Sequence, residues 1–60
     1  MYKVYIMVNK PFAEKIGQKE FTFSNVDIED TPNYLTIWDE TGTLAFRCPI
    51  NNVERFVKFK

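Results

Sequence analysis

The side chains that could carry out chemistry in this chain are few, and they do not form a catalytic pair. The sequence contains no histidine, a single serine, Ser24, and a single cysteine, Cys48. Nucleophilic catalysis needs a nucleophile that a neighbouring base activates, and no base is suitably spaced from Cys48. We therefore predict that the protein is not an enzyme and that Cys48 is a small buried side chain on a strand.

Three carboxylates that lie close together in the sequence, Asp27, Glu29 and Asp30, are the best candidates for a cation site. Asp27 and Glu29 would project from the same face of a strand, because side chains alternate along it. The sequence lacks the loop and the further oxygen ligands of a calcium site, and it has no zinc ligand set. We expect no metal and no cofactor, and we interpret the carboxylates as a solvated edge that discourages strand-to-strand aggregation.

A binding surface is the function that the residue types support best. Tyr34, Trp38 and Arg47 are of the types enriched at the energetic centres of protein interfaces. If residues 34–48 form a hairpin, one of its faces holds these three residues and Thr36. We predict that Tyr34, Thr36, Trp38 and Arg47 form the binding site of a non-enzymatic module, a small inhibitor or regulator that contacts another protein. The alternative for Trp38 is a place in the core.

The same residues offer a second function, the binding of single-stranded nucleic acid, because aromatic rings stack on bases and arginine contacts phosphates. The formal net charge is zero, and Asp39 and Glu40 follow Trp38 directly, so we rank this function second. The lysines concentrate toward the two termini and would gather on one side if the first and last strands pair. They are Lys3, Lys10, Lys15, Lys19, Lys58 and Lys60.

The hairpin that carries the predicted site is the clearest structural unit in the sequence. Residues 34–38 and 43–48 are rich in β-branched and aromatic residues, which are typical of strands, and residues 39–42 read as the turn between them. Pro49 lacks a backbone donor and should stop the second strand. Asn51-Asn52 then supplies a tight polar turn before a last apolar run.

Two pairings of this hairpin compete. With a two- or four-residue loop, Ile37 lies opposite Phe46, whereas a turn ending in a glycine bulge shifts the pairing by one and brings Trp38 to the inner face. Burial favours the first pairing, because it collects the aliphatic side chains on one side and leaves Arg47 outside. The inner face then holds Leu35, Ile37, Leu44, Phe46 and Cys48, and the outer face holds Tyr34, Thr36, Trp38, Ala45 and Arg47.

The rest of the chain adds three strands and at most one helical turn. Residues 2–8 alternate, with Tyr2, Val4, Ile6 and Val8 on one face. Residues 12–16 predict a short helix in which Phe12 and Ile16 share a face, or an irregular loop fixed by Phe12. Residues 20–29 form one long strand whose apolar phase slips at Ser24-Asn25, which predicts a β-bulge there. Residues 54–60 form the last strand.

Five strands with short connections, a bent second strand and a one-turn link before the fifth make up this layout. Over residues 33–60 it resembles the SH3-like small barrels, in which a short 3₁₀ turn precedes the final strand; Gly42, Pro49 and Asn51-Asn52 carry the resemblance. The resemblance implies an all-β fold, a five-stranded antiparallel barrel with at most one short helical turn, in a single domain over residues 1–60. The chain also resembles small accessory proteins of bacteriophages and mobile elements, which often act by binding a host protein.

The composition is that of a globular domain, with 45% hydrophobic and 17% aromatic residues. No apolar run approaches the roughly 20 residues that span a bilayer, so we expect no membrane role. Nothing near Met1 reads as a secretion signal, and we expect a cytoplasmic protein. A small barrel has little core and two exposed strand edges, so we also expect a homodimer that buries two copies of Trp38 and Tyr34 across a two-fold axis.

Overall fold

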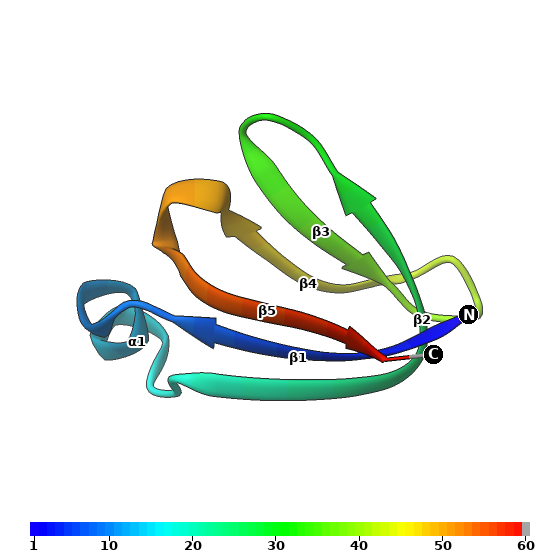
Figure 1. Cartoon of the computed structure of the whole chain (residues 1–60), viewed down its shortest axis with the longest axis horizontal. Helices are drawn as coiled ribbons and strands as arrows, with labels where there is room; N and C mark the ends of the chain where they lie inside the picture. The colour runs from blue at the N-terminus through cyan, green and yellow to red at the C-terminus, as the bar shows by residue number, and fades with distance from the viewer. Residues whose placement is uncertain (60) are drawn as a thin grey trace.

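The protein forms one antiparallel sheet of five strands with a short helix at one end (Figure 1). The structure, a computed structural model, describes residues 1–59. The strands are β1 (Tyr2–Val8), β2 (Glu20–Asp30), β3 (Tyr34–Trp38), β4 (Leu44–Pro49) and β5 (Val53–Phe59), and they lie in the order β4-β3-β2-β1-β5. A helix, α1 (Lys10–Ile16), follows β1, and a 3₁₀ turn, Ile50–Asn52, precedes β5. The predicted five-stranded, mostly β fold is confirmed; Lys60, the predicted end of the last strand, lies outside the described residues.

The long strand β2 belongs to both halves of the sheet and bends between them. Its first part pairs with β1 and its last part with β3, and Figure 1 shows it turning from one half into the other. The pairing shifts by one residue between Val4–Phe23 and Tyr2–Val26, and Asn25 has a positive φ of 57°. The predicted bulge at Ser24-Asn25 is therefore confirmed. It lets the apolar residues on both sides of the bend reach the core: Phe21, Phe23, Val26 and Ile28.

The predicted barrel does not close. β4 and β5 form the two edges of the sheet and are not hydrogen-bonded neighbours. Since neither edge strand pairs with the other, the hydrogen-bonded ladder ends at β4 and at β5. The link between them is a 3₁₀ turn that is bonded to other parts of the chain: the N–H of Ile50 donates to Asn33 O at 2.9 Å, and the N–H of Asn9 donates to Asn52 O at 2.8 Å. Phe56, which lies opposite the fully buried Ile6 on the edge strand β5, is 38% exposed.

Residues 10–16 are a helix and not a loop. The side chain of Asn9 accepts a hydrogen bond from the N–H of Phe12 at 3.0 Å, which caps the first turn. Gly17 ends the helix in the left-handed conformation, at φ 80°. Phe12 and Ala13 pack against the core, whereas Ile16 is 45% exposed, so only Phe12 of the predicted pair reaches the core. The second residue of the helix that contacts the core is Ala13 and not Ile16.

The core lies between the two halves of the bent sheet. Its fully or almost fully buried members come from β1, β2, β3 and β4: Val4, Ile6, Val8, Val26, Leu35, Ile37 and Cys48. Four half-buried phenylalanines extend it, and the rings of two of them, Phe21 and Phe46, lie 4.7 Å apart between centroids. The predicted inward face of residues 2–8 is confirmed for its three aliphatic members. Burial of these side chains is the main stabilising term for a sheet of this size.

The hairpin β3–β4 combines features of both predicted pairings. Ile37 lies opposite Phe46 and Leu35 opposite Cys48, as the burial argument predicted. The turn nevertheless has the glycine bulge, because the N–H of Gly42 donates to Asp39 O at 3.0 Å and Gly42 has a φ of 83°.

A register shift of one residue between Ile37 and Trp38 reconciles the two features. Trp38 pairs with Leu44, and the extra residue in β4 is Ala45. The prediction that Leu44 points inward is wrong, since Leu44 lies beside Trp38 and is 49% exposed. The shift therefore adds an apolar residue to the outer face of the hairpin.

Candidate functional site

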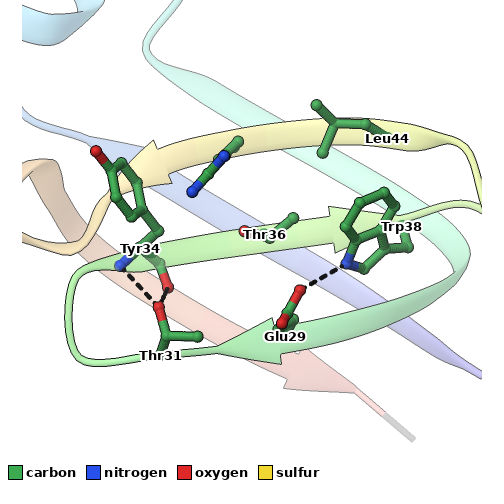
Figure 2. A pocket seen from close by; sticks show the side chains of 7 residues that line it. Glu29, Thr31, Tyr34, Thr36, Trp38 and Leu44 are labelled. Carbon is green, nitrogen blue, oxygen red and sulfur yellow. Dashed lines mark hydrogen bonds between the residues drawn. The ribbon is translucent and has the colours of Figure 1, made fainter.

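The outer face of β2, β3 and β4 carries a shallow hollow of about 160 Å³ (Figure 2). All four residues of the predicted site line it: Tyr34, Thr36, Trp38 and Arg47. Figure 2 shows Tyr34 and Trp38 at the two ends of β3 with Thr36 between them. The structure thus brings the predicted residues together around one concave surface.

Thr36 forms the floor of the hollow. Only 5% of its surface is exposed, although it lies on the outer face of the sheet. It pairs with Glu29 of β2 on one side and with Arg47 of β4 on the other. Neighbouring strands lie about 4.8 Å apart, so the backbones of Glu29 and Arg47 are separated by roughly 10 Å. Thr36 is smaller than its four neighbours in the sheet, which are two long charged side chains and the rings of Tyr34 and Trp38. A depression is therefore left above it.

Trp38 forms one end wall and is held by a carboxylate. Its indole Nε1 donates a hydrogen bond of 3.0 Å to Glu29 Oε1, across the β2–β3 pairing (Figure 2). The indole is half-buried and lies on the outer face, so the alternative of a core position does not hold. Leu44, its cross-strand neighbour, extends this apolar wall. A half-exposed indole beside an exposed leucine offers a partner a flat apolar surface with a fixed orientation.

Tyr34 and Arg47 form the opposite end. The Arg47 guanidinium carbon lies 4.2 Å from the centroid of the Tyr34 ring, within the range of a cation–π interaction. Thr31 fixes the backbone of Tyr34, because its hydroxyl accepts from the Tyr34 N–H and donates to the Tyr34 carbonyl, both at 3.1 Å. Stacking aligns the planar guanidinium while its edge keeps N–H groups available for a carboxylate.

The turn beyond Trp38 is ordered by Asp39. Its Oδ1 accepts from the N–H of Thr41 and the N–H of Thr43, both at 2.9 Å, and from the Thr41 hydroxyl at 2.6 Å. These hydrogen bonds hold the pKa of the Asp39 carboxyl below its usual value, the Thr41 side chain contributing most. The Asp39 carboxylate therefore stabilises the turn through its hydrogen bonds. The ordered turn positions Leu44, the first residue of β4, beside the indole.

Three residues that line the hollow were not assigned to the binding site from the sequence, namely Glu29, Thr31 and Leu44. Glu29 was predicted on an outward strand face, but the partner strand of that face could not be inferred from alternation. Leu44 was placed on the wrong face. A threonine three residues before a tyrosine is the local signal for the Thr31 turn, since threonine hydroxyls commonly bond to backbone groups two to four residues away.

The structure also shows where the carboxylates considered for a cation site and the thiol of Cys48 lie. Asp27 pairs with Trp38 and Glu29 with Thr36 on the outer face, whereas Asp30 pairs with the inward-facing Leu35. Within residues 1–59, no three histidine, cysteine or acidic side chains gather to hold a metal ion. Cys48 is fully buried, and burial raises the pKa of its thiol.

Comparisons of the chain with protein-family models, with curated proteins and with solved structures found no match. Among the helices of the described part of the chain, none is long and apolar enough to cross a membrane. The site is therefore interpreted from its own geometry.

Proposed function

We propose that the protein is a non-enzymatic binding module that contacts another protein through the hollow on β2, β3 and β4. The observation that carries this proposal is the arrangement around Thr36, where Trp38 and Leu44 form an apolar end and the Tyr34–Arg47 stack forms a cationic end. Tryptophan, tyrosine and arginine dominate the energetics of protein interfaces. A layout like that of the SH3-like small barrels, with a 3₁₀ turn before the last strand, is consistent with such a role.

The size of the hollow suits one apolar side chain of the partner. A cavity of about 150 Å³ accepts a benzene-sized group, and this hollow measures about 160 Å³. An apolar side chain lodged against Trp38 would place a neighbouring acidic residue of the partner near Arg47. We infer a partner segment that combines an apolar side chain with a nearby carboxylate, since arginine pairs with a carboxylate through two parallel hydrogen bonds.

Nucleic acid suits this hollow less well. Glu29 lines it, and Asp27 pairs with Trp38 on the same face, so phosphates would meet two carboxylates beside one arginine. The turn carries Asp39 and Glu40 as well. The charges of this face therefore favour a protein partner over a polyanion.

A capture experiment from a lysate of the native host, with mass spectrometry, tests the proposal. The immobilised wild-type chain is compared with Trp38→Ala, Arg47→Glu and the control Glu14→Gln, which changes an exposed residue of α1. We expect a protein that is retained by the wild type and the control and is lost with both site variants. Retention by all four baits, or recovery of nucleic acid alone, would refute the proposal.

A further inference from the structure

The charges of this neutral protein are unevenly distributed along the chain. Residues 20–53 hold six of the eight acidic residues and only one of the eight lysines and arginines, so their formal charge is −5. The remaining residues, which supply β1, α1 and most of β5, carry +5. Because β1 and β5 pair, the basic residues of β1 and β5 lie in the same half of the molecule. The pairing of the first and last strands, on which the predicted gathering of lysines depended, is thus confirmed; Lys60 lies outside the described residues.

The outer face of β1 and β5 places aromatic rings between cations. The residues between the buried Val4, Ile6 and Val8 point away from the core and form three cross-strand pairs: Lys3 with Phe59, Tyr5 with Val57 and Met7 with Arg55. Lys3 and Arg55 therefore mark the two ends of this face. Phe59 lies directly opposite Lys3 at one end, and Tyr5, in the middle of the face, is diagonal to Phe59 at about 7–8 Å. We call these six residues the β1–β5 face.

Phe59 is the most accessible apolar side chain of the β1–β5 face, with 45% of its surface exposed. The Lys3 ammonium lies 5.9 Å from the centroid of its ring. A lysine close to an exposed ring lets one ligand unit meet both a stacking surface and a positive charge. Lys58 pairs with the buried Val4 and so projects from the other side of the sheet, where its ammonium lies 4.6 Å from the Tyr2 ring centroid.

We infer that the β1–β5 face binds single-stranded nucleic acid, with phosphates at Lys3 and Arg55 and bases on Tyr5 and Phe59. Charge complementarity favours a polyanion for this half of the molecule, since its described residues hold six lysines and arginines against three acidic residues, a formal charge of +3. The exposed ring selects a polyanion with unpaired bases, because every base offers a π-face for stacking. This site lies on other strands than the hollow and uses none of its residues, so either site can fail without the other.

One carboxylate opposes the inferred ligand. Glu20, at the start of β2, accepts a hydrogen bond of 2.7 Å from the Tyr5 hydroxyl. It pairs with Met7 at the end of the β1–β5 face that Arg55 marks. Phosphates are therefore expected mainly toward Lys3 and Phe59, and removal of the Glu20 charge should strengthen binding.

Fluorescence anisotropy with a labelled twelve-nucleotide poly(dT) strand tests the inference. We expect binding at low salt, with about two phosphates neutralised, so that the logarithm of the association constant falls with a slope of roughly −1.4 against the logarithm of the salt concentration. Arg55→Gln and Lys3→Gln should each weaken binding several-fold, and Phe59→Leu at least about fivefold through lost stacking. Glu20→Gln should strengthen it.

The control is Lys15→Gln, which removes the same charge from α1, outside the β1–β5 face. Equal losses for Lys15→Gln and Arg55→Gln would overturn the inference, because net charge alone would then explain the attraction. So would equal affinity for duplex DNA or heparin, absence of binding at low salt, or self-association of the protein in place of binding. Amide shifts in an NMR titration, confined to β1 and β5, would support the site independently of any variant.

Discussion

Glu29 and Arg47 lie on opposite sides of Thr36, and each contacts an aromatic ring of β3. Glu29 Oε1 accepts from the Trp38 indole at 3.0 Å, and the Arg47 guanidinium lies 4.2 Å from the centroid of the Tyr34 ring. The two charged side chains are therefore drawn toward diagonally opposite corners of the hollow. This arrangement keeps the space above Thr36 open, where an ion pair across β3 would cover it.

Trp38 should report directly on occupancy of the hollow, because it is the only tryptophan in the chain. We expect the emission of the free protein to be that of a partly exposed indole, quenched by iodide, and to shift to the blue when a partner binds. Trp38→Phe keeps a ring but loses the hydrogen bond to Glu29, so it should weaken partner binding less than Trp38→Ala does. Emission of a fully buried indole in the free protein would contradict this geometry.

Arg47→Lys should show whether the planar stack on Tyr34 matters. A lysine keeps the charge but cannot present two parallel donors, so we expect partner affinity to fall about tenfold while stability changes by less than about 0.5 kcal/mol. Calorimetric titration with the captured partner measures the affinity, and urea unfolding measures the stability. Arg55→Lys on β5 is the matched control and should leave partner affinity as it was.

Self-association through the hollow is a separate prediction. Because Glu29 and Arg47 flank Thr36, a two-fold axis near Thr36 would bring each guanidinium toward the carboxylate of the second copy. We expect sedimentation to show a dimer at high protein concentration, and Trp38→Ala to weaken it more than Met7→Ala does. A monomer at all concentrations would leave the hollow to a different protein.

Gly42→Ala should destabilise the fold without any steric clash. A Cβ at this position meets nothing within 4 Å, but φ is 83°, a conformation that costs an L residue about 1–2 kcal/mol. The midpoint of urea unfolding should fall accordingly with an unchanged slope. Gly42→Asn should lower the stability less than Gly42→Ala does, since asparagine tolerates this conformation. Equal stability of the alanine variant would show that the turn rearranges.

Cys48 should be inert in the folded protein. It is fully buried, and burial raises the pKa of its thiol, so the reactive thiolate is scarce at pH 8 as well as at neutral pH. We expect thiol reagents to label it only as fast as the protein unfolds, and at once in concentrated urea. Rapid labelling under native conditions would mean that β4 opens locally.

The sequence was sufficient to predict strands and their buried faces where apolar and polar residues alternate regularly and the alternation ends or slips at an identifiable residue. The alternation over residues 2–8 predicted the buried face of β1, and the phase slip at Ser24-Asn25 predicted the bulge of β2. The positions of Tyr34, Thr36, Trp38 and Arg47 on one face followed from the same rule. Period-two patterns succeed because they depend on neighbours in the chain alone.

The predictions from the sequence were wrong or incomplete where the structure depends on contacts between residues that are far apart in the sequence. Leu44 points outward because the register shifts beside Ala45, and no residue type there signals an extra position in the strand. The sheet stays open because β4 and β5 do not pair, and whether two edge strands pair depends on the whole arrangement of the sheet. Glu29 belongs to the hollow only because β2 pairs with β3. Such pairings cannot be inferred from local alternation.

The pairing of β1 with β5 also constrains how the protein acquires its structure during synthesis. β1 is synthesised before its neighbour on one side, β5, and three strands and a helix separate the two in the sequence. The edge of β1 that pairs with β5 therefore remains uncovered until residues 53–59 have been synthesised. Such sequence-distant contacts slow folding, because the chain between them must first be ordered. The hairpin β3–β4, whose contacts are local, can form while β1 still lacks that neighbour.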